Sequence, residues 1–592
     1  MSTLHFKGKV FVQNHHLAVP HHELVAVKAK GLSPKPALHD NLIIEGDNLK
    51  ALKALLPTHH GKVKLVYIDP PYNTGNEKWA YNDAVNSPMM QEWLGKTVDR
   101  DDLTRHEKWC CMMLPRLKLL KELLRDDGVI FVSIDDHEMH HLRVLMDEVF
   151  GAENFIAQLV WEKGRKNDAK LFSAGHEYMV AYARSMERLR VLKTVWREPK
   201  PGAKEIWKTY CELRAKHAGN NQKIEDALRE WYRSLPDKDP SKALSRYKHI
   251  DQHGPWRDRD ISWPGGDGPR YDVIHPTTKK PCRVPEPGWR FSTKEKMDEQ
   301  IRLGLVVFRD DHTEPPFRKA HLIPVAEELD DDSESNGLDP ENGEETSVGM
   351  QVMGTYIYKQ SQVAVKYLRD LMGKRAFSNP KDYEVIARII RYCTSPGDVV
   401  LDSFAGSGTT AHAILALNKE DGGDRRFVLI ECEDYVDELT AERVRRVIKG
   451  VPKAKNETLR TGLGGTFSYF KLGRPLEIQA ILEGKDLPSY QALAEYIFFT
   501  ATGETWDEKK MDRKKWFIGE SRQYDVFLMY EPNAEKLKNL ALNLDLARAL
   551  PNISGKQKLV FAPTKYLDEY FLDHLRITFQ QLPYQIYRAI EK

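Results

Sequence analysis

Short apolar runs alternate with amphipathic segments between residues 42 and 184. Apolar runs of this length are typical of buried strands, and leucines that recur every third or fourth position are typical of helices. The predicted strands are LIIEGD, VKLVYIDPPY, GVIFVSID, NFIAQLVWEK and EYMVAYA, and the predicted helices are NLKALKALLP, LPRLKLLKELLRDDG with its glycine as the stop, and MHHLRVLMDEVFG. Strands that alternate with helices predict an open α/β sheet.

The pattern changes at about residue 185, where alternation stops and Pro, Gly, Trp and Arg become frequent. It resumes at 375 with KDYEVIARIIRYC as a helix, GDVVLDSFAGSGTT as a strand, turn and helix start, and RRFVLIECED as a strand, so one sheet should span both sides of a loop-rich insert. We therefore expect an N-terminal arm (1–40), the first part of the sheet (41–184), an insert (185–355) with a solvated acidic loop (327–346), the second part of the sheet (356–455), and a small C-terminal α/β domain (456–592).

Composition narrows the class of protein. The 592 residues include 89 Lys and Arg against 87 Asp and Glu, a net charge of +2, which excludes a polycation but not a basic groove for nucleic acid. The N-terminal stretch lacks the apolar core of a signal peptide, and no apolar stretch approaches the roughly 20 residues of a membrane span. None of the six cysteines forms a CxxC pair, so we expect a reduced, cytoplasmic protein without a disulfide framework or zinc ribbon.

The most specific motif is Asp69-Pro70-Pro71-Tyr72, directly after the strand KLVYI. Two consecutive prolines fix the backbone and remove two N–H donors, which leaves carbonyl oxygens free to accept. The Asp69 carboxylate and the Pro70 carbonyl offer two acceptors for the two N–H groups of an exocyclic amine, and Tyr72 offers a flat face for a base. The alternative is a rigid turn that ends a strand, with Asp69 as a cap.

A second motif runs from Asp402 to Thr410 (DSFAGSGTT) after the strand DVVL, and Glu431 ends the next strand. Glycines let a backbone approach a ligand closely, and an acid at the end of the next strand accepts hydrogen bonds from ribose hydroxyls in nucleotide sites. The turn is neither the phosphate-binding GxGxxG nor a P-loop. A purely structural glycine turn is the alternative.

Weaker candidates surround these motifs. Asp47 ends a strand and is as consistent with a helix cap as with a site residue, and Asn379-Pro380-Lys381 precedes the helix before the glycine strand. Arg165 and Lys166 are candidates for phosphate contact. His176-Glu177-Tyr178 has no third ligand at a suitable spacing, so we expect no metal site.

The two motifs together resemble the amino-methyltransferases of DNA, in which (D/N/S)PP(Y/F/W) binds the target base and FxGxG, here Phe404 to Gly408, binds S-adenosylmethionine. The tetrapeptide precedes the glycine motif by more than 300 residues, an order that resembles the beta group. The strings YIDPPYNTGN, HEYMVAY, GWRFS and FSNPKDYEVIARIIRYCTSPGDVVLDSFAGSGTTAHA resemble the Mod subunits of type III restriction–modification systems, over about residues 40–460.

This resemblance implies a Rossmann-like methyltransferase sheet interrupted by a target-recognition insert, and methylation of adenine N6 in duplex DNA by base flipping. It implies that the flipped adenine is held by Asp69, Pro70, Pro71 and Tyr72, and that the cofactor is bound by Asp47, Asn379, Lys381, Asp402, Phe404, Gly406, Ser407, Gly408, Thr409 and Glu431. The implied partners are duplex DNA, a second copy of the chain and a restriction (helicase–nuclease) subunit.

Two alternatives stay open. Cytosine N4 presents the same two N–H donors as adenine N6, although that class more often carries Ser at the position of Asp69. The chain could also be an inactive DNA-recognition scaffold for a nuclease. A cytosine C5 mechanism is discarded, because the only Pro-Cys step, Pro281-Cys282, lies in the irregular insert and lacks the glutamine usual after that pair.

Overall fold

The structure, a computed structural model, describes residues 3–74, 105–164, 171–264, 266–325, 349–454, 457–476 and 487–582. The chain forms two compact units, one made of residues 1–192 and 355–592 and the other of residues 193–354. Within the described ranges, no helix combines the length and the apolar character needed to cross a bilayer.

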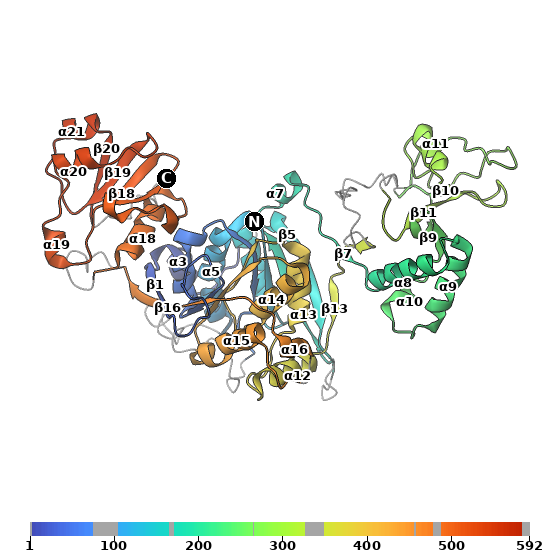
Figure 1. Cartoon of the computed structure of the whole chain (residues 1–592), viewed down its shortest axis with the longest axis horizontal. Coiled ribbons are helices and arrows are strands. Elements are labelled where there is room, and N and C mark those ends of the chain that lie inside the picture. The colour runs from blue at the N-terminus through green and yellow to red at the C-terminus, as the bar shows by residue number, and fades with distance from the viewer. Residues whose placement is uncertain are drawn as a thin grey trace. The chain divides into compact units, whose positions relative to one another are not determined.

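The first unit is built on a ten-stranded sheet (Figure 1). In spatial order its strands are β1 (His22–Ala26), β16 (Ser468–Pro475), β2 (Leu42–Glu45), β15 (Arg426–Glu431), β14 (Val399–Asp402), β3 (Val63–Ile68), β4 (Leu124–Ile134), β6 (His176–Ala183), β5 (Phe155–Glu162) and β13 (Tyr356–Tyr358). The six strands from β16 to β4 are parallel, whereas β6 runs antiparallel to both of its neighbours. The predicted open α/β sheet is thus present, and it joins segments from both sides of the insert.

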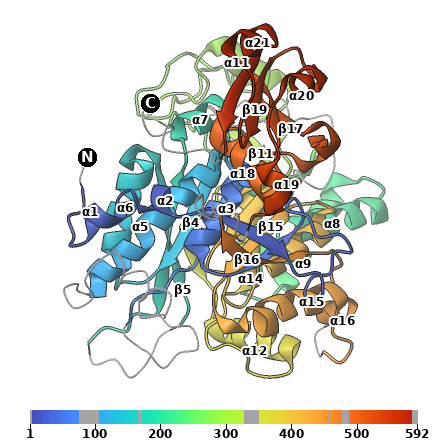
Figure 2. The same cartoon turned by 90° about the vertical axis from the view of Figure 1, so that its left-hand side faces the viewer.

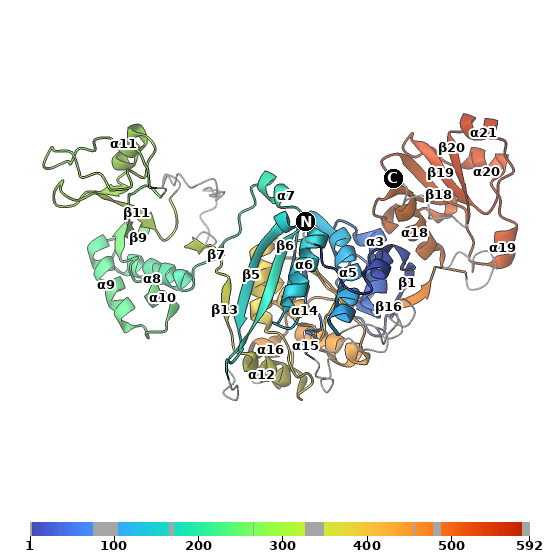
Figure 3. The ribbon, with the colours of Figure 1, turned by 180° about the vertical axis from the view of Figure 1, so that it is seen from behind.

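Helices cover both faces of this sheet. One face carries α3 (Asn48–His59), α5 (Arg105–Leu123) and α6 (Met139–Phe150), of which α5 and α6 are prominent in Figure 3. The other face carries α13 (Tyr383–Cys393), α14 (Thr409–Asp421) and α15 (Glu442–Lys449), and α12 (Ser361–Met372) packs against α15. The central strands are therefore buried on both sides: all six residues of β3 (VKLVYI) are buried, and its one charged residue, Lys64, pairs with Asp127 at 2.9 Å.

Three predicted boundaries are wrong. Residues 1–40 are not a separate arm, because β1 pairs with β16 and the short helices α1 (Lys9–Val12) and α2 (His15–Ala18) lie beside α5 (Figure 2). The second part of the sheet does not end at 455, because β16 pairs with β2. Gly128 does not stop a helix: α5 ends at Leu123 and Gly128 lies inside β4, where an added Cβ would come within 3.0 Å of the Val63 carbonyl oxygen.

The C-terminal segment forms a smaller mixed α/β layer. Its sheet contains β17 (Phe517–Glu520), β18 (Tyr524–Leu528), β19 (Gln557–Ala562) and β20 (Ile577–Gln581), and its helices are α18 (Tyr490–Thr502), α19 (Ala534–Lys538), α20 (Leu544–Ala549) and α21 (Glu569–His574). The Trp506 amide donates to the Pro57 carbonyl at the end of α3, 2.7 Å away, so this layer is joined to the main sheet within one compact unit.

The second unit contains more regular structure than its loop-rich sequence predicts. It holds the helices α8 (Ala203–Lys216), α9 (Asn221–Ser234), α10 (Pro240–Ala243) and α11 (Lys294–Arg302), and a sheet in the order β10 (Val306–Val307), β11 (Phe317–His321), β9 (Gly254–Arg259) and β8 (His249–Asp251). A two-stranded ladder of β7 (Glu198–Pro199) and β12 (Met350–Gln351) lies near its two chain ends. Ile224, Leu228 and Tyr232 give α9 one apolar face, which packs on α8.

Candidate active site

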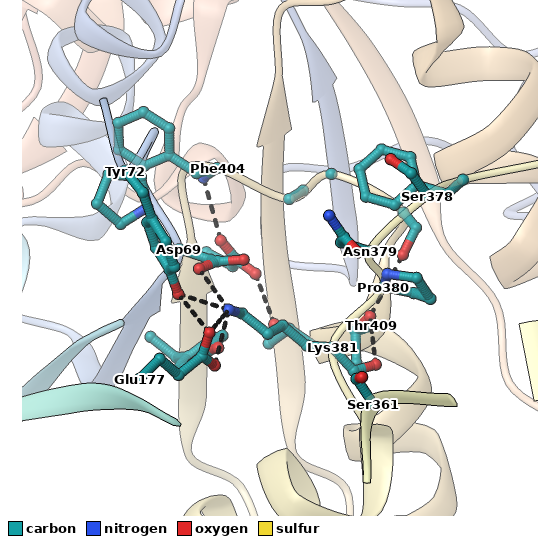
Figure 4. A pocket seen from close by; sticks show the side chains of 18 of the residues that line it. Asp69, Tyr72, Glu177, Ser361, Ser378, Asn379, Pro380, Lys381, Phe404 and Thr409 are labelled. Carbon is teal, nitrogen blue, oxygen red and sulfur yellow. Dashed lines mark hydrogen bonds and ion pairs between the residues drawn. The ribbon is translucent and has the colours of Figure 1, made fainter. Parts of the chain in front are cut away.

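A pocket opens where β3 and β14 end. The two strands are parallel neighbours, with Leu401 opposite Val66, so the residues that follow them meet at one edge of the sheet. Side chains and backbone from both motifs line the pocket (Figure 4): Asp69, Pro70 and Tyr72 from the first, Asp402, Phe404, Ala405, Gly406, Ser407, Thr409 and Thr410 from the second, and Asn379, Pro380 and Lys381 from the segment before α13. Two stretches more than 300 residues apart in sequence therefore share one cavity.

The tetrapeptide is held so that one carbonyl stays available. The Trp109 indole N–H donates to the Pro71 carbonyl oxygen at 2.7 Å, which fixes the turn from behind. No described residue donates to the Pro70 carbonyl oxygen, and Pro70 is one of the residues that line the pocket. The double proline thus leaves an acceptor beside the Asp69 carboxylate, as expected from residues without N–H groups.

A compact cluster of charges, the buried quartet, lies at the floor of the pocket and consists of Asp69, Lys163, Glu177 and Lys381. The Lys381 ammonium is 3.0 Å from Asp69 Oδ1 and 2.9 Å from each Glu177 oxygen, and the Lys163 ammonium is 2.5 Å from Glu177 Oε2. Lys381 also donates to the Tyr72 hydroxyl at 2.6 Å and lies 4.8 Å from the centre of its ring. The quartet therefore fixes the orientation of the tyrosine ring and of the carboxylate together.

Burial and pairing act in opposite directions on the pKa values of the quartet. Burial raises the pKa of Asp69, opposed in part by Lys381, and burial lowers the pKa of Lys163 to about 8, opposed in part by Glu177. For the other two groups pairing outweighs burial. The pKa of Glu177 falls to about 2 because of the two lysines, and the pKa of Lys381 is raised by Asp69 and Glu177. Glu177 is therefore the ionised anchor of both ammonium groups.

The glycine turn forms the opposite wall. Gly406 and Gly408 have φ angles of +50° and +78°, which favour glycine, and an added Cβ on Gly408 would lie 3.1 Å from the Thr440 carbonyl oxygen. Asp402 closes the turn: one carboxylate oxygen accepts from the Phe404 amide at 3.1 Å and the other from the Thr410 hydroxyl at 2.5 Å. Of the two glycines, Gly406 lines the pocket, where it presents backbone without a side chain.

Two carboxyl groups at this wall have pKa values well above their ordinary range. Burial raises the pKa of Asp402 and that of Glu431, each to about 7. Glu431 accepts from the Gly406 amide at 2.7 Å and from the Cys432 amide at 2.8 Å, so it supports the turn directly. Glu431 and Gly408 do not line the pocket themselves; Gly408 is the N-cap of α14.

Other predicted residues take different places. Asp47 caps α3 by accepting from the Lys50 amide at 3.1 Å and is not part of the pocket lining, so the helix-cap alternative describes its position. The Lys381 ammonium pairs with the carboxylates of Asp69 and Glu177 within the protein, rather than being left for the carboxylate of a cofactor. Arg165, Lys166 and the acidic loop 327–346 lie outside the described residues.

Sequence reasoning missed Glu177 and Lys163. Glu177 was considered only as part of a possible metal motif, although an acid in the otherwise apolar strand HEYMVAYA is itself a signal that it has a buried partner. Lys163 follows β5, and the antiparallel pairing of Trp161 with Glu177 brings the lysine beside the acid. That pairing is tertiary and has no local sequence signal.

Comparisons with known proteins give a consistent result. The model of a DNA methylase family, N6_N4_Mtase, matches residues 63–442. The chain is 30% identical over 411 residues to the type III restriction–modification enzyme EcoP15I Mod subunit of Escherichia coli, covering 67% of this chain and 58% of that one. It is 29% identical to the StyLTI Mod subunit of Salmonella typhimurium (74% and 61% covered) and 28% identical to the type II methyltransferase M.KpnI of Klebsiella pneumoniae (68% and 82%). The chain thus spans about three fifths of the length of the two Mod subunits.

Proposed function

Because this chain belongs to the DNA methylase family, we propose that it transfers a methyl group from S-adenosylmethionine to adenine N6 in duplex DNA, as the modification subunit of a restriction–modification system. The observation that supports this most directly is the shared pocket, since Tyr72 of the first motif and Phe404 of the second line the same cavity. A methyl group can pass from a cofactor to a base only if the turns that bind the two ligands border the same cavity.

The first motif suits an exocyclic amine. The Asp69 carboxylate and the Pro70 carbonyl are adjacent acceptors, and an amine on a base has two N–H groups to donate. The Tyr72 ring gives the base a surface for stacking, worth about 1–3 kcal/mol per base. A base inside a duplex cannot reach a pocket at the edge of the sheet, so it must rotate out of the helix at a cost of a few kcal/mol, part of which the stacking offsets.

The second wall suits S-adenosylmethionine. Gly406 gives it an open backbone, and Phe404, Ser407 and Thr409 complete the surface, while Asp402 and Glu431 hold the turn in shape. When bound, this cofactor supplies a methyl group activated by its sulfonium. Asn379 lies on the same rim and is the remaining candidate for a polar contact to it.

The residues of the chain contribute positioning and electrostatics. The lone pair of an adenine amine is delocalised into the ring, so the nitrogen is a poor nucleophile. Hydrogen bonds to Asp69 and Pro70 favour a pyramidal nitrogen whose lone pair is available, and such fixed acceptors require no reorganisation during the reaction. Lys381 and Glu177 hold Asp69 and Tyr72 in place for this step.

The direct test is to incubate the protein with methyl-labelled S-adenosylmethionine and mixed-sequence duplex DNA, and then to identify the labelled nucleoside by mass spectrometry. We expect N6-methyladenine in the parent and none with Asp69→Ala. Detection of N4-methylcytosine instead would show that the target is cytosine N4 rather than adenine N6. DNA binding without transfer would support the inactive scaffold.

Site choice belongs, in this proposal, to residues 193–354. Removing them should abolish sequence preference while leaving cofactor affinity within a few-fold, because both walls of the pocket come from the other unit. Loss of cofactor binding as well would refute the assignment. Arg165 and Lys166 are proposed phosphate contacts, so replacing one by alanine should lower the slope of log affinity against log salt by about 1.

We further propose that the chain acts in the cytoplasm as a homodimer that docks a restriction (helicase–nuclease) subunit through its C-terminal α/β layer. Light scattering after size exclusion tests the dimer, with the full chain compared against one ending at 476. A shorter cut at 455 would remove β16 from the main sheet and could not separate dimer loss from misfolding. A monomeric full chain would refute this arrangement.

A further inference from the structure

Three side chains of metal-binding type converge behind the base-binding turn. His106 is the second residue of α5, Glu138 is the N-cap of α6, and His141 lies in the first turn of α6. His106 Nδ1 is 2.7 Å from Glu138 Oε1, and His141 Nδ1 is 2.8 Å from Glu138 Oε2. One ligand atom from each of the three residues lies within 4.8 Å of the others.

The donor set matches a zinc-type site. Two imidazole nitrogens and one carboxylate oxygen are ligands that Zn²⁺ accepts with a fourth, open position for water. Glu138 and His141 have the Glu-x-x-His spacing that places two ligands on one side of a helix turn, as in metal-binding bundles. Ligands bound to tetrahedral zinc lie about 3.4 Å apart, given metal–ligand distances of about 2.1 Å, so a small opening of the cluster admits the ion.

Access and burial are also suitable. The Glu138 side chain is fully buried, whereas the side chains of His106 and His141 are 40% and 23% exposed. A buried carboxylate supplies negative charge, and the partly exposed imidazoles leave a route for the ion and its water. His137, the residue before Glu138, contacts the Asp135 carboxylate instead and is therefore a matched histidine outside the cluster.

The cluster is linked to the proposed active site through Asn73. The side-chain amide of Asn73 donates from Nδ2 to Glu138 Oε1 and, at 3.3 Å, to the Arg105 carbonyl oxygen. Asn73 is fully buried, has a φ of +60° and directly follows Tyr72. A residue that hydrogen-bonds to a metal ligand orients that ligand and is itself held in place by it.

We propose that His106, Glu138 and His141 bind a divalent cation of the zinc class, and that the ion fixes Asn73 and with it the turn that carries Tyr72. The binding site stands on the geometry of the cluster alone. Only its effect on base binding rests on the proposed methyltransferase function, so the two can fail separately.

The test uses the full chain after chelator treatment and dialysis, titrated with Co²⁺, whose visible absorption reports tetrahedral coordination, and with Zn²⁺ in competition. We expect one Co²⁺ per chain, displaced by Zn²⁺, with His137→Ala unchanged. Glu138→Gln and His141→Asn should each weaken binding by at least about tenfold. Zn²⁺ should also raise the melting temperature of the parent and of His137→Ala but not of Glu138→Gln, because an ion that binds only the folded state stabilises it.

Absence of Co²⁺ absorption in the parent would overturn the proposal, as would binding that His137→Ala removes as completely as His141→Asn. These measurements need neither DNA nor S-adenosylmethionine, so they hold whether or not methyl transfer is found. The melting temperature without metal separates variants that have lost the ion site from variants that have lost the fold.

Discussion

Replacing Glu177 by glutamine should expose the energetic role of the buried quartet. Glu177 is 4% exposed and pairs with two ammonium groups at 2.5 and 2.9 Å, while Asp69 pairs with one of them. With all four groups ionised their charges cancel, and Glu177→Gln leaves an excess positive charge in a buried site. Removing one partner of a buried ion pair typically costs about 3–5 kcal/mol, because the remaining charge is uncompensated.

Lys163 limits that cost. Burial already lowers its pKa to about 8, and Glu177 is the main group that opposes this shift, so in the variant the lysine can release its proton near neutral pH. We therefore expect the lower end of the range, about 3 kcal/mol. An unfolding entropy of about 2.1 cal/mol/K per residue over the roughly 430 residues of this unit gives about 1 °C per kcal/mol, so its melting temperature should fall by about 3 °C in scanning calorimetry at pH 7.

A double variant separates charge balance from lost packing. Lys163→Met with Glu177→Gln removes one charge of each sign and leaves the Lys381–Asp69 pair intact, so it should be more stable than Glu177→Gln alone, with a coupling energy above about 1 kcal/mol. Additive effects of the two substitutions, or a Glu177→Gln melting temperature equal to that of the parent, would refute the reasoning. Methyl transfer measured on the folded double variant then reports what Tyr72 orientation contributes.

Three further results are expected. Asp69→Asn should lower the rate of methyl transfer by about 10²–10³, as for other preorganised electrostatic groups, while cofactor affinity measured by calorimetry stays within a few-fold; an equal loss of both would contradict its assignment to the base. Tyr72→Ala should weaken binding of a duplex with a mismatched target base by about 1–3 kcal/mol, and Tyr72→Phe by less, in fluorescence anisotropy. Burial raises the pKa of Glu431 from 4.5 to about 7, so the folded chain holds a proton that the unfolded chain releases, and stability falls as pH rises between these values. Glu431→Gln should lose this part of the pH dependence, about 3 kcal/mol in the free energy of unfolding for about 2.5 pKa units. If the free energy of unfolding changes with pH in the same way in parent and variant, the raised pKa of Glu431 is excluded as the cause.

The pattern of apolar residues predicted seven of the ten strands, the block from β2 to β5 in spatial order, but not the outer strands β1, β16 and β13. β3 (VKLVYI) has one charged residue among five apolar ones, and β14 is the run VVLD. Both end in chemically distinctive turns, so their identity and their polar ends were readable without knowledge of their neighbours. The helix α9 was readable in principle from Ile224, Leu228 and Tyr232, but the charged residues between them were taken as part of a loop-rich insert. Its apolar face packs on α8 and on the strand β8.

The candidate site was only half readable for a different reason. Motif residues such as Asp69 and Asp402 can be recognised from the residues next to them in the sequence. The members of the quartet, in contrast, come together only through the order of strands in the sheet. Glu177 reaches Lys381 because β6 lies two strands from β3 and the segment before α13 returns over the same edge. Nothing within a few positions of Glu177 encodes that meeting, and the same is true of His106, which lies 32 positions before Glu138.

The sheet also explains how a long insert can separate the two motifs without disturbing the pocket. The chain leaves for residues 193–354 after β6 and α7 (Met186–Val191), and it re-enters as β13, which pairs with β5 at the sheet's outer edge. In spatial order β4, β6 and β5 lie between β13 and β3, whereas β14 contacts β3 from the other side. The register of Leu401 against Val66, which sets Asp402 beside Asp69, therefore involves no strand at which the insert begins or ends. Under the proposed function, this arrangement lets changes within the insert alter which DNA is presented while the two walls that would hold base and cofactor keep their separation.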